Sequence, residues 1–99
     1  MSELNKEIPL TINGDANRFE LHIDGHLAVI EYSMKGNVFV LLHTEVDKAL
    51  EGRGIAAILT EKTFHHLESI GAKIIPLCPY IVGYLKKHPE WMRIVEQSR

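Results

Sequence analysis

Apolar and polar residues alternate along the first half of the chain, as they do in strands with one buried face. The alternation predicts four strands, over residues 8–12, 19–23, 26–32 and 38–46. Asp24-Gly25 is a strong signal for a two-residue hairpin turn, and Lys35-Gly36-Asn37 provides a second turn. The first half therefore predicts antiparallel strands, with the apolar run at 38–46 in a central position and 8–12 at an edge.

The second half of the chain changes to the three- and four-residue spacing of helices. A helix is expected over residues 53–70, and Gly71 suits its C-terminal cap. Its predicted buried stripe consists of Ala56, Leu59, Thr63, Leu67 and Ile70. A strand at 73–77, a helix at 79–87 and one or two helical turns within 91–97 follow.

The connection between the last two predicted strands sets the fold class. Because a helix joins the strands at 38–46 and 73–77, these strands are expected to pair in parallel through a right-handed crossover. Pro76 has no N–H group for the ladder, so the second strand must be an edge, be bulged or splay from its neighbour. The sequence thus predicts one α/β (α+β) domain over residues 1–99, a mixed sheet with antiparallel N-terminal strands followed by a β-α-β-α unit.

The turn before the long helix, Leu50-Glu51-Gly52-Arg53-Gly54-Ile55-Ala56, carries the first chemical signal. The first N–H groups of a helix have no intrahelical partner, and the helix dipole places partial positive charge at that end. Glycine lets an anion approach the backbone, and Arg53 can add a charge-assisted contact, so the turn is predicted to hold a phosphate or pyrophosphate. The alternative is a tight connection without a ligand. The spacing matches neither a P-loop nor a full dinucleotide-binding fingerprint.

Composition and charge narrow the possible functions. With 45% hydrophobic residues, the chain of 99 residues can form a single core. Its formal net charge of −2 argues against a general nucleic-acid binder. No apolar stretch approaches the ~20 residues that a membrane helix needs, and the N-terminal residues lack a signal-peptide core. The single cysteine, Cys78, excludes an internal disulfide, so a reducing compartment, most simply the cytosol, is expected.

Cys78 and two tyrosines lie where the second helix is predicted to begin. Pro79 suits the first helical position, which makes Cys78 the expected N-cap, and the helix dipole would lower the pKa of its thiol. Cys78 is therefore either a partly exposed reactive thiol or a small buried apolar residue. Tyr80 and Tyr84 are one helical turn apart, and a hydroxyl here could donate a proton in a cleft. The role of a partly buried aromatic anchor suits Tyr80 better than Tyr84.

His43 is the histidine most suited to catalysis, because it lies near the C-terminal end of the apolar strand, beside the expected cleft. A satisfied core or rim histidine is its alternative role. No histidine pair has the helical spacing of a zinc motif, and there is no second cysteine, so a metal site is not expected.

Four segments together resemble a short, stand-alone subfamily of the GNAT superfamily of acyl-CoA N-acetyltransferases. They are His43-Thr44-Glu45-Val46, Gly52-Arg53-Gly54-Ile55-Ala56, Pro76-Leu77-Cys78-Pro79-Tyr80 and Tyr84-Leu85-Lys86-Lys87-His88-Pro89-Glu90-Trp91. The superfamily's pyrophosphate turn reads Gln/Arg-x-x-Gly-x-Gly/Ala. Gly54-Ile55-Ala56 fits this pattern, whereas Glu51 departs from its first position. The resemblance spans most of the chain between His43 and Trp91 and implies a GNAT-like fold with a splayed pair of parallel strands.

The resemblance also implies a cofactor and roles for the site residues. The segment from Thr44 to Val46 would offer backbone groups to the pantetheine arm of acetyl-CoA, and the turn from Gly52 to Ala56 would hold its pyrophosphate. Tyr84 would protonate the departing CoA thiolate. Cys78 is the suspected reactive residue, and His43 or Glu45 could serve as the base.

The implied function is transfer of an acetyl group from acetyl-CoA to an amine of a protein or small molecule, either directly or through Cys78. A non-catalytic acetyl-CoA- or CoA-binding or interaction module is the alternative, and an α/β domain without a CoA site is a third possibility. Neither a nucleic-acid nor a membrane partner is expected. The identity of the acceptor and the oligomeric state do not follow from the sequence.

Overall fold

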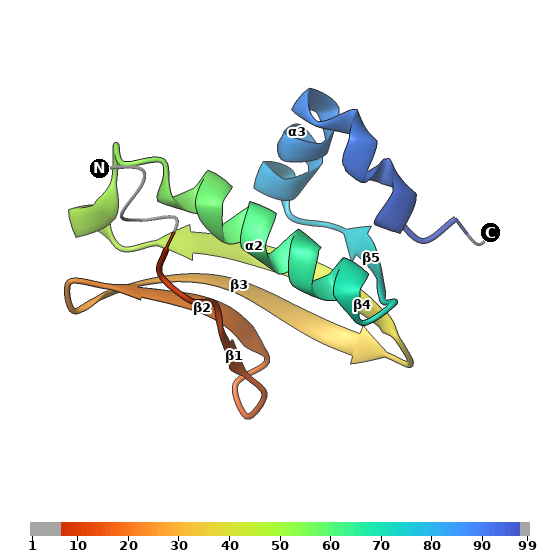
Figure 1. Cartoon of the computed structure of the whole chain (residues 1–99), viewed down its shortest axis with the longest axis horizontal. Helices are drawn as coiled ribbons and strands as arrows, with labels where there is room; N and C mark the ends of the chain where they lie inside the picture. Colours follow the sequence, from red (N-terminus) through yellow and green to blue (C-terminus); the bar gives the residue numbers. More distant parts are fainter. Residues whose placement is uncertain (1–6, 98–99) are drawn as a thin grey trace.

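The computed structural model describes residues 7–97, which form a mixed sheet with helices packed on one face (Figure 1). The strands, in order across the sheet, are β1 (Thr11–Asn13), β2 (Arg18–Ile23), β3 (His26–Lys35), β4 (Val38–Val46) and β5 (Lys73–Pro76). The helices are η1 (Lys48–Leu50), α2 (Ile55–Ser69), α3 (Pro79–Lys87) and η2 (Pro89–Ile94), of which η1 and η2 are 3-10 helices. The strands β1 to β4 pair antiparallel and β4 pairs with β5 in parallel, which confirms the predicted mixed sheet.

A two-residue turn joins β2 to β3 in the antiparallel half of the sheet. Asp24 and Gly25 both have positive φ, 53° and 78°, as the central residues of a type I′ hairpin turn require, and they join β2 to β3. The edge strand begins at Thr11, later than the sequence predicts. Pro9 cannot donate to a ladder, and regular pairing with β2 starts only after it.

A β-bulge interrupts β4 in the middle of the sheet. Tyr32 pairs with Leu41 and Glu31 pairs with His43, so Leu42 is an extra residue in β4. In a regular strand Leu41 and His43 would share one face, because side chains alternate with a period of two. The bulge instead places Thr44 on the face of Leu41, and His43 on the opposite face.

The strand β5 leaves β4 after a short parallel ladder, whose last pair is Leu41 with Pro76. Pro76 has no N–H group to donate, and the Leu41 carbonyl accepts hydrogen bonds from the N–H groups of Leu77 (3.0 Å) and Cys78 (3.1 Å). Beyond this point β4 continues to Val46 while the chain turns into α3 (Figure 1). The two strands therefore splay, as the sequence predicts.

The helix α2 lies across β2, β3 and β4, and α3 and η2 lie beside α2 toward β5 (Figure 1). Its buried residues are Ile55, Leu59, Thr60, Thr63, Phe64 and Leu67. The predicted stripe is thus correct in its middle but wrong at Ile70, which is exposed. The helix ends at Ser69, and the left-handed Gly71 (φ 72°) redirects the chain, so Ile70 falls at the C-cap beyond the packed stripe.

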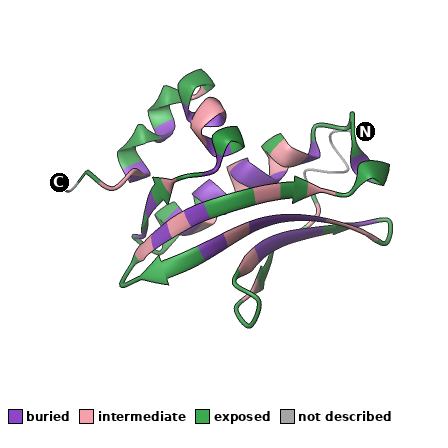
Figure 2. Ribbon diagram, turned by 180° about the vertical axis from the view of Figure 1, so that it is seen from behind, coloured by how far each residue is buried: buried purple, intermediate pink, exposed green. Residues whose placement is uncertain are grey.

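The opposite face of the sheet carries no helix within residues 7–97 (Figure 2). None of the helices in this part of the chain is long and apolar enough to cross a membrane. The C-terminal segment returns to the sheet edge, where Val95 forms a parallel bridge with Ile74 and the N–H of Glu96 donates to the Ile74 carbonyl (2.8 Å).

Two threonines on the buried face of α2 provide a test of the core. Both are fully buried, but the Thr60 hydroxyl donates to the Ala56 carbonyl (2.8 Å), whereas the Thr63 hydroxyl has no partner among the described residues. Because Val has the shape of Thr without the hydroxyl, Thr63→Val should raise the free energy of unfolding by ~1 kcal/mol. The matched control, Thr60→Val, should lower it by ~1 kcal/mol. Denaturant unfolding measures both, and a destabilised Thr63→Val protein would contradict the expectation.

Candidate functional site

Two left-handed glycines shape the turn between η1 and α2. Gly52 and Gly54 have φ of 82° and 71°, a conformation that glycine adopts readily and other residues rarely. Gly54 is the N-cap of α2, and no side chain among residues 7–97 caps the helix. The N–H of Ile58 donates to the Gly54 carbonyl (3.2 Å), while the N–H groups of the preceding helical residues face out of the helix end. A Cβ atom on either glycine would meet no heavy atom within 4 Å, so the space in front of the turn is open.

The two charged residues of this turn are placed differently. Arg53 reaches back to the turn between β2 and β3, where its Nη1 lies 3.5 Å from Oδ2 of Asp24. Glu51, at the first position of the pyrophosphate pattern, is exposed. The turn therefore offers an anion mainly its backbone N–H groups and the dipole of α2.

A cavity of about 330 Å³ lies against the glycine turn. It is lined by Val46, Leu50, Glu51, Gly52, Gly54, Ile55, Ala56, Ala57 and Tyr80. The end of β4, the start of α2 and the start of α3 thus meet at one place. This arrangement brings together most of the residues predicted to bind the cofactor.

Cys78 and Thr44 face each other across the splay between β4 and β5, with Sγ 3.3 Å from Oγ1. Cys78 is the N-cap of α3 and Pro79 is its first residue, as the sequence predicts. Of the two alternatives for Cys78, the partly exposed thiol is wrong and the buried position is correct, because Cys78 is only 3% exposed. Cys78 lies where β4 and β5 separate, between β4 and the first turn of α3, and is thereby shielded from solvent.

Hydrogen bonding tunes the Cys78 thiol. Burial raises the pKa of this group, but the Thr44 hydroxyl and the backbone N–H groups of Ile81, Tyr80 and Thr44 together lower it below its ordinary value. The net direction favours the thiolate, which is the nucleophilic form of cysteine. The thiol is thus buried among hydrogen-bonding groups, unlike a cysteine that serves only for packing.

The two tyrosines of α3 are placed differently from the sequence expectation. Tyr84 is the buried one, at 8% exposure, and its hydroxyl donates to Oε1 of Glu61 on α2. Burial and this hydrogen bond raise the pKa of Tyr84 far above its ordinary value. Tyr80 is 38% exposed and lines the cavity at the glycine turn. The role of aromatic anchor therefore belongs to Tyr84, because Tyr84 is buried and bonded to Glu61 of α2, whereas Tyr80 is partly exposed.

His43 and Glu45 lie together on the open face of the sheet. Their side chains are well exposed, and His43 Nε2 is 3.9 Å from Oε1 of Glu45. Thr44, which contacts Cys78, is on the other face, because side chains alternate along β4 after the bulge. The structure therefore does not bring His43 or Glu45 together with the thiol.

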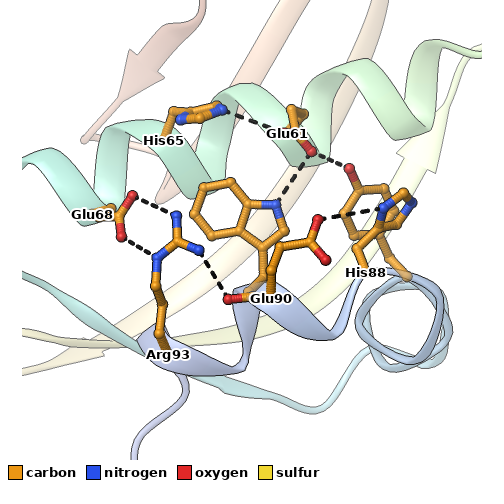
Figure 3. Close-up of polar contacts among 8 residues, drawn as sticks. Glu61, His65, Glu68, His88, Glu90 and Arg93 are labelled. Carbon is orange, nitrogen blue, oxygen red and sulfur yellow. Dashed lines mark hydrogen bonds and ion pairs between the residues drawn. The ribbon is translucent and has the colours of Figure 1, made fainter.

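A polar cluster between α2 and η2 was not anticipated from the sequence (Figure 3). Glu61 accepts hydrogen bonds from the Tyr84 hydroxyl and from Trp91 Nε1 (3.4 Å), and it lies 3.3 Å from His65 Nε2. A cavity of about 570 Å³ opens here, lined by Ala57, Ile58, Glu61, Lys62, His65, Tyr84 and His88. The spacing of four residues between Glu61 and His65 was the available signal. The cluster fastens α3 and η2 to α2.

The arrangement suits a ligand rather than a metal ion. Within residues 7–97, no group of three His, Cys, Asp or Glu side chains is positioned to hold a metal. The site instead combines an uncapped helix N-terminus, a polarised thiol and two adjoining cavities. These features match the binding of an anionic organic molecule and chemistry at sulfur.

Comparison with known families places this geometry in context. A family model described as GCN5-related N-acetyl-transferase matches residues 18–94. The match runs from the first residue of β2 to the last residue of η2, and it includes the glycine turn, Thr44 and Cys78. A search of curated proteins found no matching relative.

The hydrogen bond between Thr44 and Cys78 should be measurable through thiol reactivity. Alkylation of Cys78 by iodoacetamide should rise with pH along a curve whose midpoint lies below that of free cysteine, about 8.5. Thr44→Val removes a donor to the thiolate and should raise this midpoint toward that of free cysteine. Thr11→Val, on the distant strand β1, is the control and should leave it unchanged. A midpoint that Thr44→Val does not move would mean that this hydroxyl does not tune the thiol.

Proposed function

The chain belongs to the GCN5-related N-acetyltransferase family, and we propose that it binds acetyl-CoA and transfers the acetyl group to an amine. One observation carries the proposal: chain neighbours of Thr44 and of Cys78 line the same cavity as the glycine turn. Val46, two residues beyond Thr44, and Tyr80, two residues beyond Cys78, both line the cavity at the turn. An anion at the turn and a reacting group at the thiol can therefore belong to one ligand.

The character of the cleft fits acetyl-CoA. The uncapped N-terminus of α2 suits a pyrophosphate, since its N–H groups and dipole favour negative charge. Val46, Leu50 and Ile55 supply apolar walls for the pantetheine arm. The larger cavity between α2 and α3 shares Ala57 with the cavity at the turn, which gives a long ligand further room. When bound, acetyl-CoA supplies an acetyl group that is activated as a thioester.

We assign to the end of β4 the task of holding the pantetheine arm. The ladder with β5 extends only as far as Leu41, so the segment from Thr44 to Val46 is not paired by β5. Backbone N–H and C=O groups that lack a strand partner can bond the amides of an extended ligand, as an added strand would. A ligand held in this way runs along β4 toward Cys78.

Cys78 is assigned as the nucleophile. Its thiolate forms a bond to the acetyl carbon while the bond from that carbon to the CoA sulfur breaks, and the electron pair leaves on the CoA sulfur, which takes up a proton. An amine then attacks the acetyl carbon and loses a proton to water, while the bond from that carbon to the Cys78 sulfur breaks and restores the thiolate. The Thr44 hydroxyl and the surrounding N–H groups stabilise the thiolate before attack.

Acetyl-CoA binding without transfer is the second candidate function, and the burial of Cys78 favours it. In this case the thiol would line the end of the site and the chain would act as a binding or interaction module. The two functions differ in one observable, which is whether an acetyl group appears on Cys78 or on an amine.

The glycine turn can be tested with a matched pair of variants. Gly54→Val should abolish CoA binding, because a branched side chain would fill the open space in front of the turn. It should also cost ~1–2 kcal/mol of stability, since φ at this position is positive. Gly36→Val, in the turn between β3 and β4, introduces the same strain (φ 63°) into equally open space and should leave binding intact. Calorimetry with CoA decides, and full affinity in Gly54→Val would reject the assigned turn.

The single cysteine makes the covalent step easy to observe. Incubation with acetyl-CoA should add one acetyl group that mass spectrometry locates on Cys78 and that hydroxylamine removes, because thioesters are labile to it and amides are not. Cys78→Ser retains an oxygen at the N-cap and should keep the fold and CoA binding while losing the adduct. A wild-type protein that binds acetyl-CoA but never carries the adduct would exclude the covalent route.

A further inference from the structure

The hairpin turn between β2 and β3 lies at the same end of the molecule as the glycine turn (Figure 1). Two contacts join the hairpin to the start of η1: the N–H of Asp47 donates to the Leu27 carbonyl (2.9 Å), and His26 Nδ1 lies 3.2 Å from Oδ2 of Asp47. A third contact involves the glycine turn itself, because Arg53 Nη1 lies 3.5 Å from Oδ2 of Asp24. The hairpin therefore supports the segment that leads into α2.

Arg53 is the cationic residue of the glycine turn. It stands immediately before Gly54, the N-cap of α2. A phosphate that accepts hydrogen bonds from the first N–H groups of α2 would therefore bind beside Arg53 and could pair with its guanidinium. In the structure this guanidinium is instead directed to the carboxylate of Asp24.

The ion pair between Arg53 and Asp24 is of a kind that a ligand can exchange. The side chain of Arg53 is 39% exposed and that of Asp24 is 75% exposed, so water reaches both groups. An exposed pair at 3.5 Å contributes little net stability, because water screens the two charges. A pyrophosphate carries more negative charge than one carboxylate, so it can draw the guanidinium away from Asp24.

We propose that Asp24 is a positioning residue that weakens the hold of the glycine turn on acetyl-CoA, because it competes with the pyrophosphate for Arg53. This inference rests on the proposed function. The guanidinium gives up one carboxylate when it contacts the ligand, so the net contribution of Arg53 to binding is small. Acetyl-CoA and CoA carry the same pyrophosphate and are weakened alike, which lets the product CoA leave the site more readily.

Asp24→Asn tests the inference with little risk to the fold, because Asn-Gly is a preferred pair for a type I′ hairpin turn. Calorimetry at low ionic strength should show that CoA binds this variant about two- to fivefold more tightly than wild type, the usual worth of an exposed ion pair. The control is Asp15→Asn, in the turn between β1 and β2. It removes the same charge and should leave the affinity unchanged.

Two further measurements distinguish competition for Arg53 from a general effect of charge. Asp24→Asn combined with Arg53→Gln should bind CoA no more tightly than Arg53→Gln alone, because the group that Asp24 competes for is gone. The affinity of Asp24→Asn should also fall more steeply with added salt than that of wild type, since the ligand gains a contact with a cation that was previously paired.

The outcomes that contradict the inference are distinct from those that contradict the proposed function. An unchanged affinity in Asp24→Asn, a gain that persists without Arg53, or an unaltered salt dependence would overturn the role of Asp24 and leave CoA binding in place. A wild-type protein that does not bind CoA at millimolar concentration would overturn the proposed function, and the role of Asp24 with it.

Discussion

The site depends on the place where β4 and β5 stop pairing. Pro76 is the last residue of β5 and has no N–H group, so the ladder ends against Leu41, whose carbonyl then accepts two N–H groups of the departing chain. Continued pairing would seal the gap between the strands with backbone hydrogen bonds. Because pairing ends there, one edge of β4 is left open, Cys78 meets Thr44, and α3 begins in time to direct Tyr80 into the cleft.

Sequence patterns predicted correctly those features of the fold that depend on neighbouring residues in the chain. The bounds of β4 and α3, the hairpin at Asp24-Gly25 and the N-cap at Cys78 follow from strand periodicity, from a residue pair that tolerates positive φ, and from proline at the first helical position. The glycine turn was likewise predicted, because its function as a helix entrance is a property of backbone conformation. Prediction of the parallel pair rested on a general rule for strands that are joined by a helix.

The rest depended on features that no local pattern carries. The bulge at Leu42 adds one residue to β4, so the faces of all later positions are exchanged, and His43 is turned away from the thiol while Thr44 is turned toward it. The burial of Cys78 arises from packing between segments more than thirty residues apart in the chain. The exchange of roles between Tyr80 and Tyr84 has the same origin, because Glu61 on α2 determines which hydroxyl is engaged.

Within the described part of the chain α2 has no side-chain cap, and a ligand bound at the glycine turn would therefore be linked to folding. Gly54, the N-cap, has the backbone conformation that the turn needs. It has no side chain that could accept hydrogen bonds from the first N–H groups of the helix. A bound phosphate would do so, and would serve as the N-cap that the polypeptide lacks. Ligand binding would then stabilise the native state, and the melting temperature of the domain would rise with the concentration of the cofactor around it.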